Sequence, residues 1–84
     1  MRLGSEEMVA LVREIIVTSW PHRFSPGDLR DDVSLGSEGL GLDSVEVAEV
    51  ILACEERFGI AATEELFAVV PLTIFRVAGH FAGA

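Results

Sequence analysis

The chain contains no lysine, no tyrosine and only one cysteine, Cys54, among its 84 residues. A single cysteine excludes an internal disulfide, so a disulfide-stabilised secreted fold is not expected and a reducing cytoplasm suits the composition better. The first residues, MRLGSEEM, lack the apolar run of a signal peptide, and no stretch approaches the ~20 apolar residues of a membrane helix. We therefore expect a soluble, cytoplasmic protein that does not insert into membranes.

The charge is strongly one-sided. Fourteen acidic residues face six arginines, which gives a formal net charge of −8. Such a surface repels nucleic acid and anionic membranes, because phosphates need positively charged partners. We expect no nucleic-acid partner, and we expect proteins with basic patches to bind instead.

Residues 1–84 are long enough for one small domain, and half of them are hydrophobic, so a modest core can form without a metal. A first helix is predicted to begin at Ser5 as N-cap, with acidic residues in its first turn. Pro21 is predicted to end this helix, and Trp20 to close the core there. The apolar residues at helical spacing are Met8, Leu11, Val12, Ile15 and Ile16.

Residues 21–43 hold two prolines, four glycines and several aspartates, a composition typical of a loop. A structureless loop of this length is unusual in a small domain. Scattered apolar residues therefore predict that the loop is attached to the core at intervals, through Phe24, Leu29, Val33, Leu35, Leu40 and Leu42.

Three further helices are expected. The second spans residues 45–58 with Gly59 as its C-terminal stop, the third is a short helix over 64–68 capped by Thr63, and the last is capped by Thr73. Residues 68–75, AVVPLTIF, have strand propensity, but the central proline argues against a strand. The last helix should bury one face, made of Ile74, Val77, Ala78 and Phe81. The prediction is an all-α fold: a small four-helix bundle, three longer helices and one short, with a long loop between the first two.

The second helix carries three stripes at about 100° per residue. The core stripe comprises Val47, Val50, Ile51, Cys54 and Phe58; the acidic stripe comprises Glu46, Glu49, Ala53 and Glu56; a third comprises Val45, Ala48 and Leu52. Like charges at this spacing repel by a few tenths of a kcal/mol per pair, and the only arginine on this helix, Arg57, lies off the stripe. Two interpretations stay open: an ordinary solvated face, or a docking surface for basic partners whose apolar part is Val45 and Leu52.

Asp43 and Ser44 stand at the start of this helix. As structure, Asp43 is a good N-cap, and Glu46 completes a capping-box pattern. As chemistry, Ser44 is a hydroxyl at a helix N-terminus, where a phosphate ester would be stabilised. Neither histidine, His22 or His80, is placed by the sequence as its base, and no G-x-S-x-G elbow is present, so a Ser-His-Asp enzyme is not expected.

Residues 39–60, GLGLDSVEVAEVILACEERFGI, resemble the signature of acyl carrier proteins. That family shows G-x-D-S-[LIV], acidic residues after the serine, and then E-E-x-F-G-I. The outline of helices agrees as well, so the resemblance covers essentially the whole chain. The matching positions are Gly41, Asp43, Ser44 and Val45, then Glu46 and Glu49, then Glu55, Glu56, Phe58, Gly59 and Ile60.

The resemblance implies a four-helix bundle whose Ser44 carries 4′-phosphopantetheine, transferred from coenzyme A by a separate phosphopantetheinyl transferase. The thiol of that arm holds acyl groups as thioesters, and the carrier itself catalyses nothing. The acidic helix, with Val45, Glu46, Glu49, Leu52 and Glu56, is then expected to meet the basic docking surfaces of ketosynthase, acyltransferase or ligase-type enzymes. The expected state is a monomer.

The type of carrier follows from finer features. Peptidyl carriers more often show G-G-x-S, so Leu42 and Asp43 favour an acyl carrier. Residues 34–46, SLGSEGLGLDSVE, look like discrete carriers of polyketide or related specialised-metabolite pathways, and no flanking linker is seen. A housekeeping fatty-acid carrier is the alternative within the family. An unmodified acidic helical adaptor for basic proteins is the alternative of another class.

Two departures from the family pattern carry expectations of their own. Residues 67–71, FAVVP, are more apolar than is usual before the last helix; they either extend a hydrophobic cleft or, as we expect, fill the core. Val45 replaces the commoner leucine. Cys54 is interpreted as a plain apolar core residue, and His22 and His80 as solvated or capping residues without metal-ligand spacing.

Overall fold

The computed structural model describes residues 4–83 and contains four α-helices and one 3₁₀ turn. In chain order these are α1 (Ser5–Ser19), η1 (Pro26–Asp28), α2 (Ser44–Phe58), α3 (Glu64–Phe67) and α4 (Ile74–Gly83). No β-strand forms between residues 4 and 83; a single antiparallel bridge pairs Ser34 with Thr73. The predicted small all-α bundle is confirmed, with three longer helices and one short helix.

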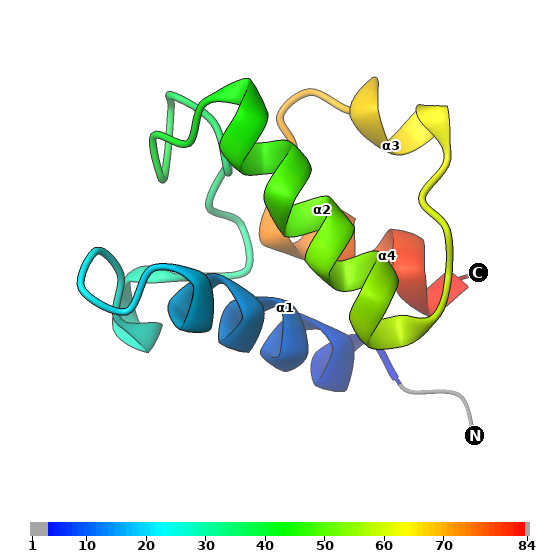
Figure 1. The fold of residues 1–84 in the computed structure, drawn as a ribbon, viewed down its shortest axis with the longest axis horizontal. Helices are drawn as coiled ribbons and strands as arrows, with labels where there is room; N and C mark the ends of the chain where they lie inside the picture. Colours follow the sequence, from blue (N-terminus) through cyan, green and yellow to red (C-terminus); the bar gives the residue numbers. More distant parts are fainter. Residues whose placement is uncertain (1–3, 84) are drawn as a thin grey trace.

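α1, α2 and α4 pack together around one core. α1 lies most extensively against α4 and also contacts α2, while α2 crosses above α1 (Figure 1). The loop after α1 runs along one end of the bundle, and α3 lies on the other side of α2, away from α1 (Figure 1). No helix in the described part of the chain is long and apolar enough to cross a membrane.

The buried side chains follow the predicted faces closely. α4 buries its four expected residues, and α2 buries the middle of its core stripe, with Val47 and Phe58 half-buried at either end. In α1 the five apolar residues at helical spacing lie in the core or, for Leu11 and Ile15, half-buried against it, and Val9 is buried as well. The loop contributes Leu29, Leu35 and Leu42 to the core.

Local sequence explains where the helices begin and end. Asp43 caps α2: its Oδ1 accepts a hydrogen bond from Glu46 N at 2.8 Å, and Glu46 Oε1 accepts one from Asp43 N at 3.0 Å. Gly59 ends α2 in the left-handed conformation, at φ 69°, which glycine adopts without strain. Thr73 Oγ1 accepts from Arg76 N at 3.1 Å and so caps α4.

Two predicted caps need correction. Ser5 is the first residue of α1 and Gly4 occupies the N-cap, because Glu7 reaches back and accepts a hydrogen bond from Gly4 N at 2.8 Å. Thr63 does precede α3, but its side chain makes no capping hydrogen bond. Its backbone N–H donates to His80 Nε2 at 3.4 Å, which joins the N-cap position of α3 to α4.

The expectation that residues 67–71 fill the core is wrong. Phe67 is 55% exposed and Val70 is 83% exposed. α3 makes a single turn, and within it Leu66 takes the buried position, so the next side chain points outward. Leu72, directly after this segment, packs against the core.

Candidate functional site at the start of α2

Ser44 is the first residue of the 15-residue helix α2, and it is exposed. The first backbone N–H groups of an α-helix have no acceptor within the helix, and they form the positive end of its dipole. A hydroxyl at this point, once esterified to phosphate, would stand where a negative charge is stabilised. The position therefore fits a phosphate ester without any rearrangement of the fold.

The residues that lead to Ser44 are held in place by backbone hydrogen bonds. Leu42 is buried and its N–H donates to Leu35 O at 3.0 Å. Gly41 has φ 75°, a left-handed conformation that suits glycine, and its N–H donates to Gly36 O at 2.8 Å. The glycine-rich approach is thus an ordered turn that ends at the N-cap, Asp43.

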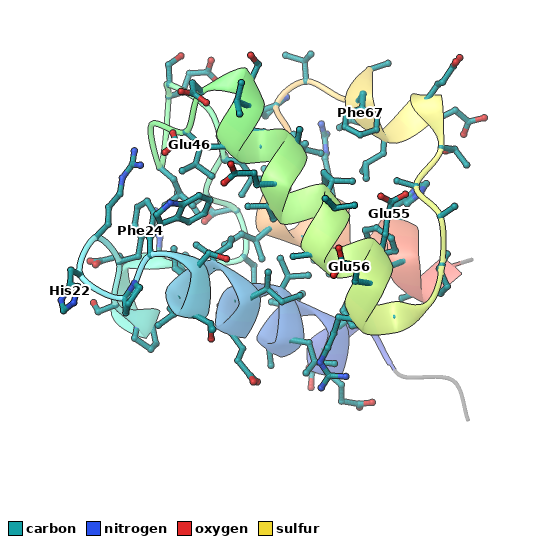
Figure 2. The ribbon with its side chains drawn as sticks, viewed as in Figure 1. His22, Phe24, Glu46, Glu55, Glu56 and Phe67 are labelled. Atoms are coloured by element: carbon teal, nitrogen blue, oxygen red, sulfur yellow. The ribbon has the colours of Figure 1, made fainter. Side chains whose placement is uncertain are left out.

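A cleft of about 400 Å³ opens directly beside Ser44. One side is formed by the loop before α2, the floor by the first turns of α2, and the other side by residues 67–72. Figure 2 shows Phe67 on the side of α3 that faces α2. Most of the lining is apolar, and it includes Leu35, Leu42, Val47, Phe67 and Val70. The alternative interpretation of residues 67–71, that they extend a hydrophobic cleft, is the one that the structure supports.

The three glutamates of the acidic stripe differ in whether they have an ion-pair partner. Glu46 is only half-exposed, and its Oε2 accepts a hydrogen bond from Arg23 Nη1 at 2.8 Å. Glu49 and Glu56 are exposed, and neither has an ion-pair partner between residues 4 and 83. Val45 and Leu52 lie exposed on the same helix. Within the acidic stripe, Glu46 alone receives a cation from the described part of the chain, and it comes from the preceding loop.

Arg23 is the functional candidate that the sequence did not reveal. It contacts α2 across 23 positions of sequence, and a second nitrogen, Nη2, donates to Gly41 O at 3.2 Å. Helical spacing carries no signal for such a pair. The sequence hint was weak, because Arg23 is one of two arginines, with Arg30, in an otherwise acidic loop.

The remaining reactive residues do not converge on Ser44. His22 lies exposed in the loop, and His80 lies in α4 against Thr63 N. Burial, and to a lesser extent the neighbouring Glu55 carboxylate, raise the pKa of the Cys54 thiol to about 12. A thiol with such a pKa is not a nucleophile near neutral pH. In the described part of the chain no group of three or more His, Cys, Asp or Glu residues is arranged to hold a metal ion.

A family model described as a phosphopantetheine attachment site matches residues 10–71, which is most of the chain and includes the whole of α2. A search of curated proteins finds no match. Members of this family carry 4′-phosphopantetheine covalently, act as carriers without catalysing a reaction, and interact with a phosphopantetheinyl transferase and with biosynthetic enzymes. Because the matched segment, the helical bundle and the exposed helix start all agree, the chain belongs to the phosphopantetheine attachment site family of carrier proteins.

Proposed function

We propose that Ser44 is the residue that carries the 4′-phosphopantetheine, and that this protein presents acyl intermediates to the enzymes of a polyketide or other specialised-metabolite pathway. The observation that supports this assignment most directly is the exposed hydroxyl of Ser44 at the first position of α2, on the rim of an apolar cleft. Asp43 contributes by capping the helix, which holds the serine at its end.

The attachment step requires no catalytic group from this chain. Ser44 Oγ attacks the phosphorus of coenzyme A that bears the pantetheine, and the Oγ–P bond forms. The phosphoanhydride bond breaks, and adenosine 3′,5′-bisphosphate leaves. The serine proton passes to a base of the transferase, since neither histidine of this chain contacts Ser44. When bound, the group supplies a thiol that holds an acyl chain as a reactive thioester at high effective concentration.

The cleft beside Ser44 suits an apolar acyl group. Its lining comes from leucine, valine and phenylalanine side chains, which gain by covering hydrocarbon in place of water. The same lining suits a saturated fatty acyl chain, so a fatty-acid carrier is a second candidate. The segment that leads into the helix, SLGSEGLGLDSVE at residues 34–46, is what favours the specialised-metabolite type.

The proposed docking surface lies along α2 and comprises Val45, Glu46, Glu49, Leu52 and Glu56. Exposed apolar side chains beside unpaired carboxylates are a suitable contact for a basic enzyme surface. Rim charges of this kind act mainly on the rate of encounter and its salt dependence. Glu49 and Glu56 are the members whose charge is free for that purpose in the described structure.

The test is the intact mass after incubation with coenzyme A, Mg²⁺ and a broad-specificity phosphopantetheinyl transferase. The wild type should gain one phosphopantetheine, Ser44→Ala should gain none, and Ser37→Ala, which removes another exposed serine, should behave as wild type. No gain in a folded wild-type sample would support an unmodified acidic adaptor instead. The mass of the species attached in the native host then separates polyketide intermediates from fatty acyl chains.

A further inference from the structure

Arg23 links the end of α1 to the start of α2. Its backbone N donates to Trp20 O at 3.0 Å, and its guanidinium lies 5.1 Å from the centroid of the Phe24 ring. Phe24 in turn packs edge-on against Trp20, with ring centroids 6.2 Å apart. Arg23 is therefore held against the end of α1 through its backbone, and its guanidinium is held over the Phe24 ring.

The other end of Arg23 holds the chain on both sides of Ser44. Nη2 donates to the Gly41 carbonyl before the serine, and Nη1 pairs with Glu46 after it. Glu46 uses its other oxygen to accept from Asp43 N, and Asp43 accepts from Glu46 N. One guanidinium thus braces a closed set of hydrogen bonds around the residue immediately before Ser44. The planar fork of arginine is suited to bridging two acceptors at once.

We infer that Arg23 is a positioning residue for the transfer of phosphopantetheine to Ser44, a role that rests on the proposed attachment at that serine. It keeps the Gly41 turn and the first turn of α2 in one arrangement, so that the Ser44 hydroxyl is presented in a constant direction. It also assigns Glu46 to this internal network. Docking to a basic transferase then depends on Glu49 and Glu56.

Positioning and docking predict opposite effects of removing Arg23. Loss of one positive charge makes the carrier more acidic and frees Glu46, so a basic transferase should bind at least as well and KM should not rise. Loss of the brace lets the start of α2 move, so kcat should fall. The two kinetic constants therefore separate a positioning role from a contact with the partner.

The experiment compares Arg23→Met with Arg30→Met in the transferase assay, using the whole carrier. Arg30 is a matched control: its side chain is 79% exposed, and its ion pair with Asp32 spans 3.6 Å. Arg23→Met should lower kcat about three- to tenfold, less than the ~100-fold that a misplacement of ~1 Å can cause. Arg30→Met, with the same change of charge, should leave kcat at the wild-type value. Arg23→Lys should be intermediate, since one ammonium replaces the fork.

Two further readouts test the route through Glu46. In the unmodified protein, amide hydrogen exchange at Val45 and Glu46 should be faster in Arg23→Met than in Arg30→Met, at equal resistance to urea. Glu46→Gln keeps an acceptor for Asp43 N but loses the pair with Arg23, so adding Arg23→Met to it should lower kcat by a smaller factor than in wild type. Glu49→Gln should change KM and leave kcat unaltered.

Equal kcat values for Arg23→Met and Arg30→Met would overturn the inference while leaving the attachment at Ser44 intact. A raised KM with unchanged kcat would make Arg23 a partner contact, which also overturns it. Strict additivity of Arg23→Met and Glu46→Gln would exclude the route through Glu46. Failure of the wild type to gain mass would instead remove the proposed function itself.

Discussion

The two sides of the cleft beside Ser44 are built in opposite ways. The first side, residues 34–42, comes from the longest connection in the chain, yet it is tied down by Leu35 and Leu42, both buried. Backbone hydrogen bonds close it on itself, including Leu40 N to Ser34 O at 2.8 Å. The second side, residues 67–72, is shorter and more apolar, yet Phe67 and Val70 are exposed.

Neither the length of a connection nor its apolar composition decides whether it is held to the core. Length does not make a connection loose, since closing a longer loop costs little and buried leucines can offset that cost. Apolar composition does not make a segment buried, since one turn of helix can bury only one of its faces. The cleft therefore has one side fixed to the core and one side of exposed apolar surface, and Ser44 stands at the fixed side.

The largest expected effect comes from removing a buried leucine side chain that holds residues 34–42 to the core. Leu35→Ala should lower the free energy of unfolding by about 2–5 kcal/mol, because a fully buried leucine leaves a cavity that the surroundings fill only in part. Val70→Ala removes apolar atoms from the exposed side and should change it by less than about 0.5 kcal/mol. Urea unfolding followed by circular dichroism measures both. Comparable losses for the two variants would erase the distinction between the sides.

A smaller loss is expected where the fixed side turns. A Cβ on Gly39 would overlap the Ser34 carbonyl oxygen and lie 2.9 Å from its carbon, so the backbone would have to shift. We expect Gly39→Ala to cost about 1–3 kcal/mol, in the range of other overpacked sites. Gly36→Ala is the matched control in the same turn, since its Cβ would meet only Ser34 Oγ at an ordinary 3.7 Å. That variant should be nearly neutral, and equal losses would show that the turn tolerates no side chain at all.

Much of this fold could be predicted from local sequence, because its signals are local. Asp43 with Glu46, Gly59 and Thr73 each mark a helix end through contacts within four residues. The burial of the loop leucines was also predictable, because an apolar side chain in a polar stretch is stabilised by packing against the core. The exposed serine at the start of α2 follows from the same cap.

What the sequence could not give depends on how separate segments meet. The pair of Arg23 and Glu46 joins two elements whose relative placement no periodicity encodes. The exposure of Phe67 in the cleft was not predicted because a four-residue helix is too short for its apolar spacing to define a face. The environment of the acidic stripe could not be predicted for the same reason, because the cation that pairs with Glu46 comes from the loop.

The smallest expected effect is a pH dependence of stability that arises from the buried Cys54. It tests whether a substitution on the exposed side of the cleft, at Phe67, alters the core below it. The pKa of the folded Cys54 thiol is about 12 against an ordinary 9.0, and the sequence has no lysine or tyrosine to add a titration in that range. In that window the unfolded chain loses the thiol proton and the folded chain keeps it. The free energy of unfolding should therefore fall with rising pH, by at most about 1.4 kcal/mol per pH unit. The slope should vanish in Cys54→Ala and persist in Phe67→Ala; a slope lost in Phe67→Ala would mean that this side does shield the core.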